Sequence, residues 1–259
     1  MRQADRLDTI LERVREDAQV DVNGLVDALG ASPATVRRDL DLLAERGLVT
    51  RTHGGARKRD SIAYDLPLRY RSANGGEAKA AIAAAAASLI RPGQVVGLSG
   101  GTTVTRIADT LAHSPFSKEL TVVTNAVDIA SQLAMNSDIR VLVVGGVLNP
   151  GTYELVGPMA HQSLSGLWLD LAFIGADAFD RSGATTRSEE EAFINRLMAS
   201  RAETGILTAS SSKYGTRTMA SIGGPEVFST VITDDGLDEA DRAELEASGF
   251  EVQTASDPE

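Results

Sequence analysis

The stretch from Ser32 to Leu43 reads SPATVRRDLDLL and predicts a helix that carries its own start signal. Ser32 precedes Pro33, which is the arrangement of an N-cap residue followed by proline at the first helical position. One apolar face at helical spacing is formed by Val36, Leu40 and Leu43. The opposite side of the predicted helix therefore carries Arg37 and Arg38 in its first turns.

Further elements are predicted on both sides of this stretch. Apolar residues at helical spacing indicate a first helix over 5–14 and a second over 22–29, which stops at Gly30. The third helix is expected to stop at Gly47. After it, 48–55 gives two short extended pieces around a turn, the size of a small β-wing. Three helices and a wing thus fit within the first 57 residues, which we expect to form one domain.

The paired arginines point to nucleic acid. A recognition helix places such side chains at base edges and flanking phosphates, and arginine suits bidentate contact with guanine. The alternative is a solvated helix face on which Arg37 and Arg38 pair with Asp39 and Asp41. The net charge of the chain is −11, yet residues 35–59 hold seven Lys and Arg against three acids. A locally basic module remains compatible with DNA, because screening limits the field to about 10 Å.

The order of these parts resembles the N-terminal winged helix-turn-helix of the DeoR family of bacterial transcription regulators. The resemblance rests on Val22, Leu25 to Gly30, Thr35 to Leu40, Leu43, Gly47-Leu48 and Arg51-Thr52-His53-Gly54-Gly55-Ala56. It implies binding to a double-stranded DNA operator. The expected DNA contacts are Ser32, Thr35, Arg37, Arg38, Arg51 and His53, with Arg51 and the run 57–59 meeting phosphates.

A linker is expected at 58–76, followed by a second domain over 77–259. Short apolar runs there alternate with helical patterns, which predicts an α/β domain with a mostly parallel sheet covered by helices. Strands are expected at 95–98, 120–124, 139–144, 171–175, 205–208, 227–233 and 250–252. Helices are expected around 77–90, 103–112, 126–135, 157–168, 189–203 and 238–248.

The first of these strands leads into Ser99-Gly100-Gly101-Thr102-Thr103 and then into a helix. Glycines and hydroxyls at a helix N-terminus present free N–H groups and the positive end of the dipole, which together attract an anion. A tight turn with capping threonines is the alternative. Loops at Asn125, Gly145-Gly146 and 175–177 follow later strands, and in an open parallel sheet these strand ends can meet at one edge.

Residues 77–253 resemble the effector domain of the same family, whose fold is similar to that of ribose-5-phosphate isomerase A. The motifs are 101–103, 121–125, 145–146, 155–158, 175–177, 183–186, 211–215 and 232–234. The family usually carries aspartates where Ser99 and Ser210 stand here. The resemblance implies a phosphorylated sugar or polyol as effector, without a cofactor.

The resemblance also assigns roles to residues. Thr102 and Thr103 would hold the phosphate, Lys213 and Lys79 would supply charge, and Asn125, Asp177 and Glu190 or Glu191 would bind hydroxyls. The other expected effector-site residues are Ser99, Gly100, Gly101, Gly145, Gly146 and Thr185.

Composition limits the other function classes. The absence of cysteine excludes disulfides, thiolate nucleophiles and sulfur-bound zinc, and three scattered histidines make no convincing metal cluster. The start of the chain shows no apolar signal core, and the longest apolar run, 80–87, is too short to span a membrane. We therefore expect a cytoplasmic protein without a membrane partner.

Two functions remain in competition. The first is a transcriptional regulator, a repressor of sugar or polyol metabolism that binds repeated half-sites as a homodimer or higher oligomer. The second is a sugar-phosphate isomerase with an accessory N-terminal domain. Isomerisation needs a positioned carboxylate base. Asp177 matches one acid of the isomerase motif, but Ile174 replaces the other and no lysine lies between Asp177 and Glu191, so the regulator is favoured.

Overall fold

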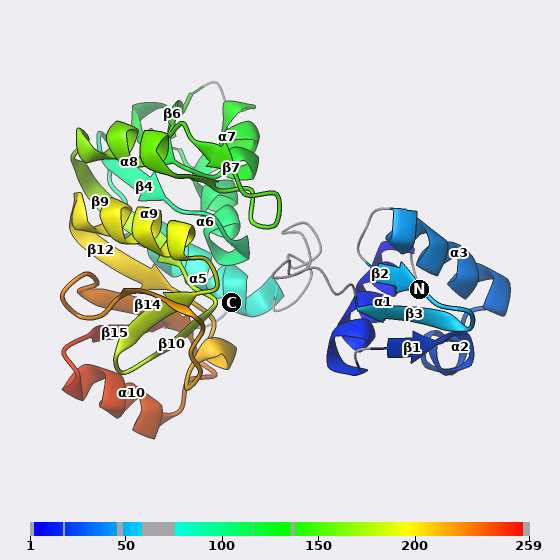
Figure 1. The fold of residues 1–259 in the computed structure, drawn as a ribbon. Helices are drawn as coiled ribbons and strands as arrows, with labels where there is room; N and C mark the ends of the chain where they lie inside the picture. Colours follow the sequence, from blue (N-terminus) through cyan, green and yellow to red (C-terminus); the bar gives the residue numbers. More distant parts are fainter. Residues whose placement is uncertain are drawn as a thin grey trace. The chain divides into compact units, whose positions relative to one another are not determined.

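A computed structural model describes residues 3–17, 19–45, 49–58, 76–115, 117–135 and 138–255. The chain divides into two compact units, Met1–Ala73 and Asn74–Glu259 (Figure 1). Of the expected linker at 58–76, residues 59–75 lie outside the described residues, as does the expected helix end at Gly47. The two units are described separately below.

The small unit has three helices and a three-stranded sheet. The helices are α1 (Gln3–Asp17), α2 (Val22–Leu29) and α3 (Pro33–Glu45). The strands β1 (Gln19–Asp21), β2 (Val49–Arg51) and β3 (Gly55–Lys58) pair antiparallel in the order β1-β3-β2. The predicted helices and wing are confirmed, whereas β1 was not predicted because three residues give too short a pattern.

The helix signals in the sequence act as expected. The Ser32 hydroxyl accepts a hydrogen bond from the Thr35 N–H at 3.2 Å, which caps α3. Gly30 ends α2 in the left-handed conformation at φ 59°. Gly55 is required where β3 meets β1, because a Cβ atom there would lie 1.9 Å from the Val20 carbonyl oxygen. The glycine thus permits the closed wing.

One buried ion pair joins α1 to α3. Arg6 Nε donates to Asp39 Oδ2 at 2.8 Å and Arg6 Nη2 donates to Asp39 Oδ1 at 3.3 Å. Asp39 is 1% exposed and lies beside the apolar side chains that α3 contributes to the core of this unit. The pair also holds the pKa of Arg6 above its ordinary value, mainly through the hydrogen bond to Asp39.

The large unit is built on a seven-stranded sheet in the order β15-β14-β12-β9-β4-β5-β6. Every neighbouring pair in this sheet is parallel. The strands are β4 (Val95–Leu98), β5 (Thr121–Thr124), β6 (Arg140–Val143), β9 (Leu169–Gly175), β12 (Ala202–Thr208), β14 (Thr230–Asp234) and β15 (Glu251–Ala255). All seven predicted strands are confirmed, with small shifts of their ends.

Helices cover both faces of this sheet (Figure 1). They are α5 (Gly76–Ser88), α6 (Thr102–Ala112), α7 (Val127–Ala134), α8 (Pro158–Ser165), α9 (Glu189–Ser200) and α10 (Glu239–Ala247). One core joins α5, α6 and α7 to the sheet, and a second core joins α8, α9 and α10 to it. Neighbouring strand residues alternate between the two, since Val122 packs in the first and Val123 in the second. The predicted α/β class is confirmed.

Several shorter pieces were not predicted. A hairpin pairs β7 (Val147–Leu148) with β8 (Leu155–Val156), and a small antiparallel sheet joins β10 (Ala178–Asp180), β11 (Gly183–Thr186) and β13 (Ala220–Gly223). Two 3-10 turns, η1 (Ser117–Glu119) and η2 (Ser211–Lys213), complete the unit. Across the described ranges, no helix combines the length and apolar character needed to cross a bilayer.

Replacing Arg6 with Ala should destabilise the small unit. The change removes the two hydrogen bonds that Arg6 of α1 donates to the buried Asp39 carboxylate of α3. Hydrogen exchange of the α3 backbone amides in the full-length chain measures the loss, because the single tryptophan, Trp168, reports only on the large unit. The matched control is Arg13→Ala, at an exposed position of α1, which should stay within about 0.5 kcal/mol. Equal protection of α3 in both variants would contradict a structural role for the pair.

Candidate functional site

The order of the large sheet reverses between β4 and β9. From β4 the chain continues through β5 to β6 in one direction, and from β9 it continues through β12 and β14 to β15 in the other. In open parallel sheets, ligands bind outside the carboxyl ends of the strands at such a switch point. The two loops at this point are Ser99–Thr103, after β4, and Gly175–Asp177, after β9.

The loop after β4 ends in an uncapped helix. Gly101 is the N-cap residue of α6 with φ 114°, a conformation that glycine adopts without strain, and no side chain caps the helix. The first-turn N–H groups and the positive end of the helix dipole therefore remain open to a ligand. The Thr103 hydroxyl is buried and has no hydrogen-bond partner among the residues that the structure describes. The loop accordingly offers hydrogen-bond donors to an anion.

The two loops at the switch point lie in contact. The Gly175 N–H donates to the Ser99 hydroxyl at 3.0 Å. A Cβ atom on Gly175 would lie 3.0 Å from the Gly100 carbonyl oxygen. Ser99 is fully buried, so its hydroxyl joins the ends of β4 and β9. The expectation that these loops meet is thus confirmed by the geometry.

Asn125, which follows β5, reaches the same place. Its Nδ2 donates to Glu154 Oε2 at 3.0 Å, and both residues are buried. Glu154 lies just before β8 in the hairpin, and a Cβ atom on Gly100 would lie 2.4 Å from its Cγ atom. The Glu154 side chain therefore packs directly against the glycine loop. Neither composition nor spacing had pointed to this residue.

The pKa of Glu154 is raised to about 8. The main cause is burial, which disfavours the charged form, and the neighbouring carboxylates Glu191 and Asp177 act in the same direction. Hydrogen bonds from Asn125 and Asn195 act against the rise. At neutral pH the Glu154 carboxyl is consequently uncharged.

The buried Glu191 and the half-buried Asp177 form an acidic cluster with Glu154. Glu191 Oε1 accepts hydrogen bonds from Asn149 Nδ2 at 2.7 Å and from the Thr152 hydroxyl at 2.5 Å. The Thr186 hydroxyl donates to Asp177 Oδ2 at 3.0 Å and lies 3.4 Å from Glu191 Oε2. These contacts join α9, β11, the β7–β8 hairpin and the end of β9. Among the described residues, no set of three His, Asp or Glu side chains is arranged to hold a metal ion.

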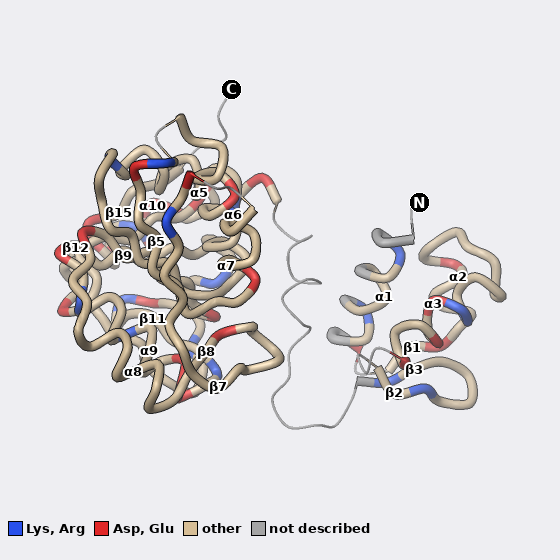
Figure 2. The backbone as a smooth tube through the Cα atoms, turned by 90° about the horizontal axis from the view of Figure 1, so that it is seen from above, with Lys and Arg blue, Asp and Glu red and all other residues tan. Residues whose placement is uncertain are grey.

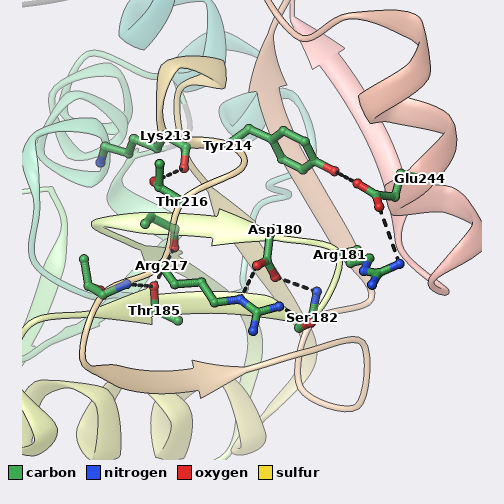
Figure 3. Close-up of polar contacts among 11 residues, drawn as sticks. Asp180, Arg181, Ser182, Thr185, Lys213, Tyr214, Thr216, Arg217 and Glu244 are labelled. Atoms are coloured by element: carbon green, nitrogen blue, oxygen red, sulfur yellow. Dashed lines mark hydrogen bonds and ion pairs between the residues drawn. The ribbon is translucent and has the colours of Figure 1, made fainter.

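Lys213 lies at the same edge of the sheet. It ends η2, after β12, and its Nζ donates to the Ala176 carbonyl at 2.6 Å, one residue before Asp177. Figure 3 shows how the following segment is fastened. The Tyr214 hydroxyl donates to Glu244 Oε2 at 2.6 Å, and Arg217 bonds to Asp180 and Ser182 of the small sheet and its turn. These contacts position the lysine beside the strand ends.

Two predicted effector residues, Thr185 and Glu190, have contacts outside the acidic cluster. Thr185 turns toward the segment after Lys213, where its hydroxyl accepts from the Thr218 N–H at 3.0 Å, whereas Thr186 faces the acidic cluster. Alternation along β11 explains the difference. Of the two glutamates considered, Glu191 is buried in the cluster, whereas Glu190 lines an exposed groove with Pro158, His161 and Phe193.

The three remaining predicted effector-site residues are Gly145, Gly146 and Lys79. Gly146 packs against β8, because a Cβ atom there would lie 2.6 Å from the Val156 carbonyl oxygen. Gly145 and Gly146 thus lead into the hairpin that carries Glu154. Lys79 is 7% exposed and lies on α5. Its role at the effector site stays a prediction.

The candidate DNA surface is the exposed side of α3. Arg37 and Arg38 are exposed, and neither forms an ion pair or hydrogen bond within the described part of the chain. The acids that the alternative required are engaged elsewhere, Asp39 by Arg6 and Asp41 by Arg51. Figure 2 shows basic positions along α3 and the wing. Both arginines are therefore available to an external partner.

Arg51 and His53 differ in availability. Arg51 Nε donates to Asp41 at 2.7 Å, and its guanidinium also bonds to the Gly55 carbonyl, so it ties the wing to α3. His53 is exposed in the turn between β2 and β3. Ser32 and Thr35 bond to each other at the start of α3, with their hydroxyl oxygens 2.9 Å apart. The wing thus has one structural arginine and one exposed histidine.

Comparisons with known proteins agree with both units. Residues 6–61 match the model of the DeoR-like helix-turn-helix domain, and 75–235 match that of the DeoR C terminal sensor domain. The chain is 36% identical over 250 residues to the HTH-type transcriptional regulator GlpR of Haloferax volcanii, covering 96% of each. It is 30% identical over 235 residues to the glycerol-3-phosphate regulon repressor of Escherichia coli, covering 90% of this chain and 92% of that one.

Among solved structures, ribose 5-phosphate isomerase A of Neisseria gonorrhoeae aligns with 54% of this chain and 53% of its own, at 19% identity and a TM-score of 0.41. The two family models together span most of the chain, and the sequence relatives extend over nearly all of it. The chain belongs to the DeoR family of transcriptional regulators.

Proposed function

We propose that this protein represses transcription by binding a DNA operator through α3 and its wing, and that a phosphorylated sugar or polyol bound at the β4–β9 switch point controls that binding. The observation that carries the proposal is the glycine loop at the switch point, which leads into a helix without a side-chain cap. The same chain has two exposed arginines on α3 that are unpaired within the described residues. Named relatives support the ligand class, since they include the glycerol-3-phosphate regulon repressor and a lactose phosphotransferase system repressor.

A ligand controls DNA binding only if it favours one of two states of the protein. Winged-helix regulators meet this requirement when two recognition helices must match two half-sites, so we propose a homodimer or higher oligomer. An effector that changes the geometry of the pair then changes the affinity for the operator. The expected consequence is a salt-dependent DNA complex that responds to ligand.

The isomerase alternative has less support. The relatives are named as regulators and repressors. In the sequence, Asp177 matches one acid of the isomerase motif, but Ile174 stands where that motif has the other. An assay for aldose–ketose interconversion on the same preparation as operator binding separates the two functions.

Replacing Arg37 or Arg38 with Ala should weaken specific DNA binding by about 1–3 kcal/mol wherever the arginine contacts a base edge in bidentate fashion. Folding should be unchanged, because both side chains are exposed and unpaired within the described residues. Titration of the upstream region of the protein's own gene measures the effect. The control Arg242→Ala removes an arginine of α10 in the large unit and should leave operator affinity intact. A folded double variant with unchanged affinity would exclude α3 from the interface.

Thr102→Val and Lys213→Ala should each weaken the binding of phosphorylated sugars. The valine removes a hydroxyl from the first turn of α6, and the alanine removes a charge-assisted donor worth about 1.5–3 kcal/mol. Calorimetry with a panel of sugar phosphates and the matching free sugars measures both. DNA binding without ligand should survive in each variant. If a free sugar binds as tightly as its phosphate, the glycine loop is a structural turn and not an anion site.

A further inference from the structure

The Glu154 carboxyl lies where it would face a bound phosphate. A Cβ atom on Gly100 would lie 2.5 Å from Glu154 Oε1, so the carboxyl covers the residue that precedes the N-cap of α6. Under the proposed function, the phosphate binds the first-turn N–H groups of this same helix. The charge on Glu154 must therefore affect how tightly the loop binds an anion.

The groups around Glu154 come from four places in the fold. Glu191 and Asn195 face it from α9, Asp177 from the end of β9, Asn125 from the end of β5 and Gly100 from the loop after β4. A lysine lies at the same edge of the sheet, since Lys213 Nζ bonds to the Ala176 carbonyl, one residue before Asp177. Negative charge thus dominates the surroundings of this carboxyl.

The two amides beside Glu154 have unused acceptors. Asn125 Nδ2 donates to the carboxyl, and Asn195 also forms a side-chain hydrogen bond with it. Within the described part of the chain, this leaves Asn125 Oδ1 and Asn195 Oδ1 buried with no hydrogen-bond partner, on residues that are 0% and 3% exposed. Unsatisfied buried acceptors call for a donor, which the hydroxyls of a ligand supply. The orphaned atoms therefore mark this cluster as part of a ligand site.

A phosphate dianion and an ionised Glu154 would repel each other strongly in this buried setting. The pKa of Glu154 is already raised to about 8 before any ligand binds, through burial and the nearby Glu191. A bound dianion would raise that pKa further, since a like charge disfavours ionisation. Ligand and proton thus favour each other's binding.

We propose that Glu154 is a specificity residue of the effector site, which accepts a phosphate dianion only while the Glu154 carboxyl carries its proton. The proposal rests on the proposed function, because it assumes that the anion binds the glycine loop. The proton comes from solvent and stays on the carboxyl while the ligand is bound. In this form Glu154 also contributes one O–H donor to a pocket rich in acceptors.

The expected pH dependence follows from linkage. Below about pH 7 the carboxyl is neutral in the free protein, so affinity does not depend on this group. As pH rises through about 8 the free protein loses the proton, and affinity should fall toward tenfold per pH unit.

The test measures binding of inorganic sulfate, whose charge stays at −2 over this range, by calorimetry on the full-length chain. Between about pH 7 and pH 9 the wild-type affinity should fall about tenfold. Glu154→Gln keeps the shape without an ionisable group, so its affinity should change less than about twofold. The control Glu203→Gln, an exposed carboxylate on β12, should behave as wild type.

The outcomes separate the two proposals. If Glu154→Gln shows the wild-type pH dependence, the proton-coupled role is overturned while the anion site stands. If sulfate binds the wild type at no pH, the glycine loop is not an anion site, and the proposed function fails with it. If the variant does not fold, the test is calorimetry of the wild type near pH 9 in buffers of different ionisation enthalpy. Uptake of nearly one proton per sulfate is expected. Absence of proton uptake would overturn the proton-coupled role of Glu154.

Discussion

The reversal of strand order between β4 and β9 is the constraint on which the site depends. Because all seven strands are parallel, their carboxyl ends lie at one edge, and the reversal separates the helices that follow β4 and β9 onto opposite faces. Ser99 then joins the two strand ends through its contact with the Gly175 N–H. The loops that carry Asn125, Asp177 and Lys213 are brought to this edge by the same topology.

Electrostatics explain how an acidic protein can attract an anion. The chain carries a net charge of −11, and the site itself contains Glu154, Glu191 and Asp177. Under the proposed function, anion binding depends on local features, namely the uncapped α6, the ammonium of Lys213 and the neutral state of Glu154. Short-range donors can outweigh a distant field because salt screens exposed charges beyond about 10 Å. Under the proposed function, the small unit must attract DNA phosphates, and there the exposed Arg37 and Arg38 of α3 supply the positive charge.

The sequence predicted the elements whose pattern is long or strongly signalled. Apolar runs predicted the seven strands of the main sheet, and the Ser32-Pro33 signal predicted the start of α3. Pieces of two to four residues, such as β7, β8 and β10, carry too few positions to show a period. In the site, the strand ends were predictable. Which of Thr185 and Thr186 contacts the acidic cluster depends on the pairing of β11. The position of Glu154 beside the glycine loop depends on a hairpin that only tertiary contacts define.

The proposed effector site requires that a phosphate bind the loop between β4 and α6. Backbone amide resonances of the isotope-labelled full-length chain, recorded with and without a sugar phosphate, test it most directly. We expect the largest chemical-shift changes at the amides of Gly101, Thr102 and Thr103, with smaller changes at Asn125 and Gly175. Shifts confined to the groove lined by Pro158, His161 and Phe193, with the glycine loop unchanged, would contradict it.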